Sequence, residues 1–383
     1  MHSPLRRREQ LGTDGAELYN LMKGRRGWPG TACVAVIAAV AGAFALDVRE
    51  NPVLSRTTEI AVVSAGGDKL VSLEELKARY KRPEAIPFPK NNPHTVEKER
   101  LGRKLFFDPR LSRSQIVSCA TCHNPSLGWS DGLPKGVGHE MQQLARRSPS
   151  VLNLAWAPLL MWDGRAHSLE HQASLPITAP EEMNMTMDDV VERLKSIEGY
   201  RDLFTQAFGE TDAISEDNVL AALATYERTL VSGKAPFDRW IEGDETAISE
   251  SAKNGFVLFN SKARCSACHA GWRFTDDSFH NIGLPTEDVG RGKFTPPSVA
   301  IMQYAFKTPA LRDLRLQGPY MHDGSMKTLD QVLEHYIKGG EKTPHLSPEM
   351  RPVDLTANEK KDLIAFLETL RGPPVTAKLP ELP

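Results

Sequence analysis

The sequence lacks a strong charge of either sign, an apolar run of full membrane-spanning length, and the alternating pattern of β-strands. With 47 basic and 49 acidic residues its formal net charge is −2, so nothing in the charge points to nucleic acid or to an anionic membrane surface. Regular alternation of apolar and polar residues is scarce, which argues against a β fold. With 383 residues, 40% of them hydrophobic and 25% charged, the chain is instead typical of a folded, water-soluble protein of two domains.

The N-terminal segment predicts export across a membrane. Basic residues precede the uncharged run Thr31 to Leu46, and the run ends in Ala43-Phe44-Ala45, a pattern that signal peptidase cleaves. A complete signal peptide begins at Met22, so residues 1–46 are expected to be an N-terminal extension and signal peptide, and the mature protein to be periplasmic. An uncleaved inner-membrane anchor is the alternative, but the run is short against the roughly 20 apolar residues of a membrane span.

Cysteine is rare, and its placement is informative. Of the five cysteines, Cys33 lies in the export segment and would leave with it. The other four form the pattern C-x-x-C-H twice, as Cys119-Ala-Thr-Cys122-His123 and Cys265-Ser-Ala-Cys268-His269. In this pattern the thiols add to the haem vinyl groups and the histidine binds the iron. We therefore expect two covalently bound haem c groups, with His123 and His269 as the axial ligands of the first and second iron.

Disulfides, a zinc site and a thioredoxin-like redox pair are the alternatives for these cysteines. Zinc sites draw on Cys and His at closed tetrahedral spacing, whereas each cysteine pair here has its own adjacent histidine. A redox C-x-x-C would sit on a βαβ pattern, which surrounds neither pair. Haem attachment also takes place outside the inner membrane, where the export segment sends the chain. The sequence therefore favours haem.

The two haem motifs lie within two copies of a longer pattern. Gly102-Arg-Lys-Leu105-Phe106 precedes the first motif and Gly255-Phe-Val-Leu258-Phe259 the second, while Pro149 to Asp163 and Pro309 to Asp323 both span 14 positions. Segments such as 215–230 have capping residues followed by apolar positions three and four apart, which is typical of helices. We expect a mainly α fold of two tandem cytochrome c-type haem domains with long loops and little strand.

The expected domains are an N-terminal extension and signal peptide (1–46), an N-terminal linker segment (47–91), an N-terminal cytochrome c domain (92–244), a C-terminal cytochrome c domain (245–375) and a tail (376–383).

Further motifs connect both halves of the chain with one known family. They are Trp162-Asp163-Gly164-Arg165, Gln172, Pro180-Glu181-Glu182-Met183 and Pro319-Tyr320-Met321-His322-Asp323-Gly324. With the two haem motifs, they make the chain resemble the bacterial di-haem cytochrome c peroxidase and MauG family from about Asn92 to Pro373. The resemblance implies a peroxidatic haem in the N-terminal domain and an electron-transfer haem in the C-terminal one.

At the first haem, the resemblance implies that Gln172 and Glu182 line a peroxide pocket. A carboxylate there would take a proton from bound peroxide and return it to the leaving hydroxide. Glu181 is the competitor of Glu182, and apart from the family an acidic pair at a helix N-terminus would be a capping feature. Trp162 resembles the tryptophan that the family places between the haems, where its indole could pass electrons; a buried aromatic at a domain contact is the alternative.

The sixth ligand of the first iron has three candidates. His139 lies 16 residues after His123, where peroxidases of this family hold a displaceable ligand, so the resemblance implies His139. The alternative is that His139 is a loop histidine in water, because a lone histidine is a weak signal. His167 and His171 are expected instead on the helix that carries Gln172.

For the second haem, the resemblance points to Tyr336. Peroxidases of the family carry an axial methionine at this position and MauG-type enzymes a tyrosine, and Tyr336 follows Pro319 by 17 residues. A thioether ligand raises the haem potential, whereas an anionic phenolate favours oxidised iron. His335 would point about 100° away around the helix, and Met326 and Met350 are the remaining alternatives.

The family also binds one calcium ion between the haems through a side-chain amide and backbone carbonyls. Gln317 and Pro319 would supply the carbonyls here, and Ser148 stands at the amide position. A hydroxyl is a weaker oxygen ligand than an amide carbonyl, so the resemblance allows a calcium ion without requiring it.

Three functions compete. The leading prediction is a di-haem c-type peroxidase, an oxidoreductase that reduces hydrogen peroxide to water with electrons from a small c-type cytochrome or another redox protein. The first alternative is a MauG-type enzyme that uses peroxide and a high-valent di-haem state to oxidise side chains of a partner protein, and Tyr336 favours it. The second alternative is a non-enzymatic di-haem electron carrier, against which Gln172 and Glu182 argue.

Overall fold

The computed structural model describes residues 61–63 and 70–383. Contacts divide the chain into two units, Met1–Thr57 and Thr58–Pro383, and all described residues belong to the second. The predicted extension and signal peptide, residues 1–46, lie outside the described residues. Among those described, no helix combines the length and the apolar character that a membrane crossing needs.

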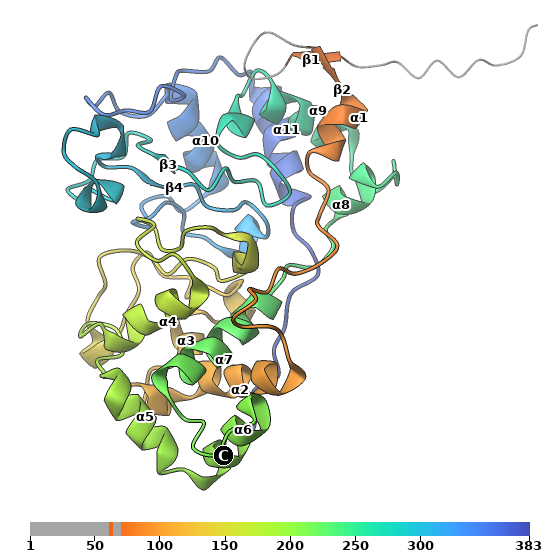
Figure 1. Cartoon of the computed structure of the whole chain (residues 1–383). Helices are drawn as coiled ribbons and strands as arrows, with labels where there is room; N and C mark the ends of the chain where they lie inside the picture. The colour runs from red at the N-terminus through yellow and green to blue at the C-terminus, as the bar shows by residue number, and fades with distance from the viewer. Residues whose placement is uncertain (1–60, 64–69) are drawn as a thin grey trace, which may run out of the picture. The chain divides into compact units, whose positions relative to one another are not determined.

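Helices and loops make up most of the described chain, and strands contribute little (Figure 1). This confirms the predicted mainly α fold. The α-helices are α1 Leu73–Ala78, α2 Val96–Phe107, α3 Cys119–Cys122, α4 Leu169–Thr178, α5 Met187–Lys195, α6 Glu198–Phe208, α7 Glu216–Thr229, α8 Pro236–Ile241, α9 Glu250–Asn260, α10 Leu329–Lys338 and α11 Ala357–Glu368. The 3-10 helices are η1 Pro109–Leu111, η2 Pro125–Leu127, η3 His139–Met141, η4 Leu154–Trp156, η5 Cys265–Ala267, η6 Arg291–Phe294, η7 Ala300–Met302 and η8 Leu314–Leu316.

The strands form two small antiparallel pairs. β1 (Ala61–Val63) pairs with β2 (Leu70–Ser72), and β3 (Phe279–His280) pairs with β4 (Phe306–Lys307). In the register of the second pair, Phe279 lies opposite Lys307. Each pair links two stretches of chain, and neither is a sheet large enough to build a core.

Helix starts follow from the capping residues in the sequence. The Ser215 side chain accepts a hydrogen bond from the Asn218 amide at the start of α7, and Thr356 with Glu359 forms a capping box at the start of α11. Such side-chain oxygens satisfy amide groups that have no partner within the helix. The helix predicted at 215–230 is therefore present.

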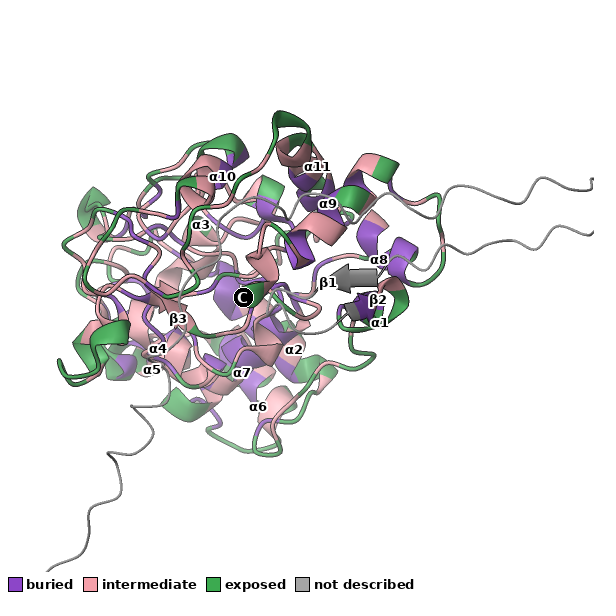
Figure 2. Cartoon of the chain, turned by 90° about the horizontal axis from the view of Figure 1, so that it is seen from above, coloured by how far each residue is buried: buried purple, intermediate pink, exposed green. Residues whose placement is uncertain are grey.

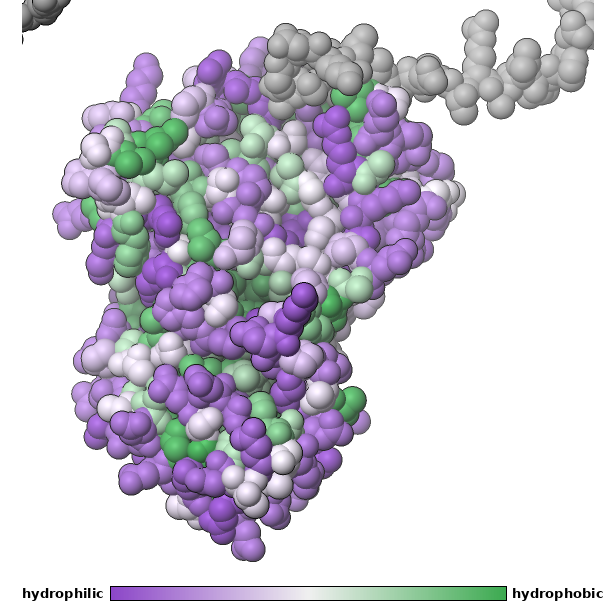
Figure 3. Space-filling model, in the orientation of Figure 1, coloured by the Kyte–Doolittle hydropathy of each residue, from purple (hydrophilic) through white to green (hydrophobic). Residues whose placement is uncertain are grey.

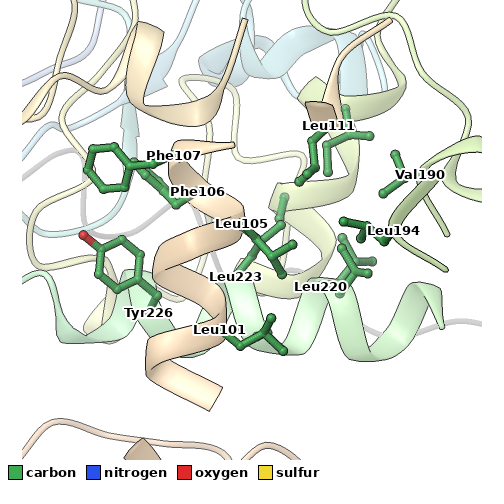
Figure 4. Packing of buried hydrophobic residues seen from close by; sticks show 14 of the residues in the cluster. Leu101, Leu105, Phe106, Phe107, Leu111, Val190, Leu194, Leu220, Leu223 and Tyr226 are labelled. Atoms are coloured by element: carbon green, nitrogen blue, oxygen red, sulfur yellow. The ribbon is translucent and has the colours of Figure 1, made fainter. Parts of the chain in front are cut away.

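A first hydrophobic core surrounds the contact between α2 and α7 (Figure 4). Leu101 and Leu105 of α2 pack with Leu223 of α7, and burial of such side chains is the main favourable term in folding. The two backbones approach closely at Gly102, where a Cβ atom would lie 1.9 Å from the carbonyl oxygen of Ala222. Only glycine fits this contact.

A second core repeats this helix contact with α9 and α11, and buried residues gather on these inner helices (Figure 2). A Cβ atom on Gly255 would lie 2.0 Å from the carbonyl oxygen of Asp362. The rings of Phe259 and Phe366 pack edge to face, with centroids 5.2 Å apart. Gly102 and Gly255 begin the two copies of the sequence repeat, so the repeat preserves the place where each helix pair touches.

Both ends of the described chain pack away from their sequence neighbours (Figure 1). Tyr80, which follows α1, is buried in the second core and donates a hydrogen bond of 2.6 Å to Asn260 Oδ1. At the other end, Val375 packs against the first core and its carbonyl accepts a bond of 2.8 Å from Trp129 Nε1. The segment before α2 and the tail after α11 therefore tie the two cores together.

The face of the molecule in Figure 3 is mainly hydrophilic, with hydrophobic residues scattered between charged ones. Such scattered residues are usual on soluble proteins and carry no inference by themselves.

The glycine contact in the second core gives a direct stability test. Gly255→Ala should lower the free energy of unfolding by about 2 kcal/mol, because overpacking costs more than the helix gains from alanine. Urea unfolding followed by circular dichroism measures this change. Asn254→Ala, at the exposed neighbouring position of α9, is the matched control and should be as stable as wild type or more so. Equal stability of both variants would contradict the close contact.

Candidate functional site

The two C-x-x-C-H segments share one backbone hydrogen bond, although the first is a turn of α-helix and the second begins as a 3-10 helix. The His123 amide donates a hydrogen bond of 2.9 Å to the Cys119 carbonyl, and the His269 amide donates one of 2.9 Å to the Cys265 carbonyl. Each bond closes one helical turn, so both cysteines and the histidine of a motif project from the same turn. The four-residue spacing seen in the sequence thus produces one compact attachment unit twice.

Both motif histidines have one ring nitrogen engaged. His123 Nδ1 lies 3.3 Å from the Trp129 carbonyl oxygen, and His269 Nδ1 lies 2.9 Å from the Phe274 carbonyl oxygen. A histidine that donates through Nδ1 presents the lone pair of Nε2 to a metal. Burial lowers the pKa of both imidazoles, which keeps them in the neutral form that binds iron.

The four described cysteines are free thiols. Burial raises the pKa of Cys122 to about 11 and that of Cys265 to about 12, and it raises the pKa of Cys119 further. Two unpaired thiols beside each metal-competent histidine are the chemistry that thioether attachment of haem c requires. The residues therefore fit two haem c groups.

The loop of His139 lies against the segment that carries Glu182. The His139 amide donates a hydrogen bond of 3.0 Å to the Glu181 carbonyl. A Cβ atom on Gly138 would lie 2.1 Å from that carbonyl oxygen and 2.8 Å from Glu182 Cα. His139 Nδ1 is buried, and no described residue hydrogen-bonds to it. The fold thus brings the segments of two predicted site residues together, although 43 positions separate His139 from Glu182 in the sequence.

Glu182 is half-buried, whereas Glu181 is exposed. Burial raises the pKa of Glu182; the charge of Arg165 lowers it and that of Glu181 raises it again. The Glu182 charge in turn helps to raise the pKa of the Cys122 thiol, so the carboxyl group lies near enough to the first attachment unit to act on it. Of the two acidic residues, Glu182 is the more buried and the one whose pKa is raised.

Gln172 and the nearby histidines lie on and beside α4. Gln172 Nε2 is 3.7 Å from Met161 Sδ. His167 and His171, the other candidates for an iron ligand, pair with each other, with their Nδ1 atoms 2.9 Å apart. His139, by contrast, has an unpartnered Nδ1, while its Nε2 lies 3.7 Å from Glu140 Oε1.

Trp162 is buried where the two halves of the chain meet. Its Nε1 donates a hydrogen bond of 3.0 Å to the Arg147 carbonyl, and its own carbonyl accepts one of 2.8 Å from the Lys307 amide. The His322 ring lies 6.4 Å away and stacks on Phe306 at 3.5 Å. The indole is therefore held by residues of both halves.

Charged groups join the halves at the same place. Arg146 bridges Asp163 at 2.7 Å and Asp288 at 2.6 Å, while Arg165 also pairs with Asp163 at 2.8 Å. Asp163 is almost fully buried, so its two arginine partners are needed to stabilise its charge.

Tyr336 of α10 lies beside the second attachment unit. Burial raises the pKa of its phenol well above the ordinary value, and the charges of Cys268 and Cys265 raise it further. The neighbouring His335 instead directs Nε2 to the Ile282 carbonyl, 2.8 Å away. His335 is therefore engaged elsewhere, whereas the Tyr336 phenol is close enough to the second attachment unit for the cysteine charges to act on its pKa. A haem iron would lower the pKa of a phenol that binds it, because a metal cation stabilises the phenolate.

The residues considered for calcium are already engaged. Ser148 Oγ donates to Asp131 Oδ2 at 2.7 Å, and the Gln317 carbonyl accepts from Arg147 Nη2 at 2.5 Å. Pro319 follows Gln317 after a cis Gly318-Pro319 peptide. Calcium needs six to eight oxygen ligands, and here a guanidinium group lies at one of the oxygens it would use. This arrangement does not fit a calcium ion.

Sequence reasoning missed two buried charged residues. Arg147 precedes Ser148 and joins both halves, and Glu227 of α7 has its pKa raised to about 8 by burial. Glu227 follows Leu220 and Leu223 at helical spacing, so its place on the buried face of α7 could have been found from periodicity. The contact of Arg147 with a carbonyl 170 positions away has no such local signal.

Comparisons with known proteins identify relatives of this chain. Residues 96–246 match the family model of di-haem cytochrome c peroxidase. The methylamine utilization protein MauG of Methylorubrum extorquens is 64% identical over 312 residues, which are 81% of this chain and 88% of that protein. Cytochrome c551 peroxidase of Nitrosomonas europaea is 35% identical over 299 residues, 76% of this chain and 85% of that protein.

A solved structure has the same fold. The crystal structure of a MauG-like protein associated with microbial copper homeostasis superimposes with a TM-score of 0.70 and 30% identity, covering 76% of this chain and 95% of that one. This chain therefore belongs to the family of di-haem cytochrome c peroxidases and MauG proteins, which are oxidoreductases.

Proposed function

We propose that this protein is a MauG-type enzyme that uses hydrogen peroxide to oxidise side chains of a partner protein, with one haem c in each of two tandem domains, 92–244 and 245–375. The observation that carries the proposal is the buried phenol of Tyr336 on α10, whose pKa is raised by burial and by the charges of Cys268 and Cys265. The 64% identity to a protein named MauG supports it, against 35% to a named cytochrome c peroxidase. The function predicted second from the sequence thus becomes the favoured one.

Tyr336 sets the redox character of the second site in this proposal. A phenolate oxygen stabilises oxidised iron, whereas a thioether would favour the reduced state. A site that stays oxidised is a poor store of electrons for reducing peroxide. It is better suited to hold an oxidising equivalent until a partner side chain supplies the electron.

The first site carries the proton transfer. The two haem groups would supply the redox equivalents that peroxide cleavage requires. Glu182, half-buried beside Cys122, takes the proton from the inner oxygen of peroxide and delivers it to the departing hydroxide, so that water leaves. Gln172 would line the same haem site, and His139 would be the group that peroxide displaces there.

Electron transfer between the sites would pass near Trp162. Its indole is buried between the two halves and contacts Arg147 from one half and His322 from the other. An aromatic ring at this junction shortens the path between two redox centres. We place the mature protein in the periplasm, where export and haem attachment both occur.

The second candidate function is a cytochrome c peroxidase that takes electrons from a small c-type cytochrome. Its supporting observation is His139, whose unpartnered Nδ1 sits in a loop that touches the Glu182 segment. A simple electron carrier is the weakest candidate, because it has no use for a half-buried carboxyl with a raised pKa beside the first site.

Glu182 gives a pH-dependent prediction. Its base form is the active one, and burial raises its pKa, so the rate constant with peroxide should rise with pH through an apparent pKa above the ordinary value of a glutamate. Glu182→Gln should lower the rate constant by roughly 100-fold and remove this rise. Stopped-flow absorbance of the haems measures both effects. The exposed neighbour offers the control Glu181→Gln, which should keep the wild-type profile; an unchanged profile in Glu182→Gln would refute the assignment.

Tyr336 separates the two functions. We expect Tyr336→Met to raise the potential of the second haem on the order of 100 mV and to increase peroxide turnover with reduced cytochrome c. In wild type, peroxide should remove the ferric EPR signals of both haems for a long period, and the variant should lose this state. His335→Gln, which can keep the bond to Ile282, should behave as wild type. Rapid turnover of cytochrome c by wild type would favour the peroxidase instead.

A further inference from the structure

Arg147 is a buried cation at the junction of the two halves, with 6% of its surface exposed. Its Nη2 atom donates to the Gln317 carbonyl at 2.5 Å and to Ser130 Oγ at 3.1 Å. Ser130 follows the first haem motif, whereas Gln317 precedes the Pro-Tyr-Met-His segment of the second half by two positions. One guanidinium group therefore binds oxygens from both halves of the chain.

The backbone of the same residue is equally engaged. The Arg147 amide donates to the His322 carbonyl at 2.9 Å, and the Arg147 carbonyl accepts from Trp162 Nε1 at 3.0 Å. Because its amide and its carbonyl are both hydrogen-bonded, the backbone of Arg147 is held in place. The guanidinium can move away only by breaking its hydrogen bonds to Gln317 and Ser130.

The surrounding charge suits a cation. Asp131 accepts a hydrogen bond of 2.7 Å from Ser148 Oγ and favours the charged form of Arg147. Tyr320 acts in the same direction, while burial lowers the pKa of the guanidinium. Arginine remains protonated in proteins under ordinary conditions. Asp131 and the Gln317 carbonyl thus have a positive partner that belongs to the chain.

We propose that the Arg147 guanidinium takes the place of a metal cation between the two halves, so that this protein binds no calcium at Ser148, Gln317 and Pro319. The Gln317 carbonyl is directed to a guanidinium, and Ser148 directs its hydroxyl to Asp131. A calcium ion would need these oxygens and would lie against a fixed positive charge. The link between the halves is therefore independent of free calcium.

The haem-loaded wild-type protein gives the first test. After dialysis into calcium-free buffer, elemental analysis by mass spectrometry should find far less than one calcium ion per chain. Isothermal titration with calcium chloride should show no stoichiometric binding, and the thermal unfolding midpoint should be the same in a chelator and in millimolar calcium. One tightly bound calcium ion per chain, with a midpoint that falls in the chelator, would overturn the proposal.

Variants of Arg147 give the second test. Loss of a buried, charged hydrogen bond should lower the unfolding midpoint of Arg147→Gln by roughly 5 °C, with a smaller loss in Arg147→Lys, which keeps the charge. Arg147→Asn supplies an amide oxygen and removes the cation, so it should take up calcium and regain stability in millimolar calcium chloride.

The matched control is Arg82, whose guanidinium also binds carbonyl oxygens, those of Ser232 and Gly233. Arg82→Asn should lose stability and gain no response to calcium. An Arg147→Asn protein with the wild-type midpoint and no calcium uptake would contradict the proposal. If a variant fails to fold, the calcium content of the wild-type protein still tests the proposal.

Discussion

The structure depends on the fixed geometry of two short turns, each of which holds a histidine against a backbone carbonyl. His123 faces the Trp129 carbonyl and His269 the Phe274 carbonyl, so each ring presents its other nitrogen in a defined direction. Each turn follows a helix that crosses another at a glycine, Gly102 in the first core and Gly255 in the second. The sites exist because these contacts place thiols and imidazole on one side of each core.

Much of this could be predicted because it is local. The C-x-x-C-H spacing defines one helical turn, Ser215 and Thr356 cap helices through bonds three residues away, and the repeat marks the crossing glycines. The scarcity of strand also followed from the absence of alternation. The roles of Tyr336, Glu182 and His139 stay predictions, although burial now distinguishes Glu182 from Glu181 and hydrogen bonding separates Tyr336 from His335.

Contacts between distant segments could not be predicted in this way. Arg147 and Gln317 meet across 170 positions, and the Tyr80 side chain reaches a core most of whose residues come more than 150 positions later. Neither contact has a periodic signal. Both contacts hold the two halves in one arrangement, with Trp162 between them. In this protein the Arg147 side chain supplies the positive charge at that junction. The spacing of the redox sites therefore depends on contacts within the chain.

Intact-mass analysis of the exported, mature protein tests the central claim most directly. The account predicts a mass that exceeds the polypeptide by two haem groups, with peptide mapping that places one on Cys119 and Cys122 and the other on Cys265 and Cys268. A mature chain with one haem or none, or with a disulfide within either cysteine pair, would contradict it.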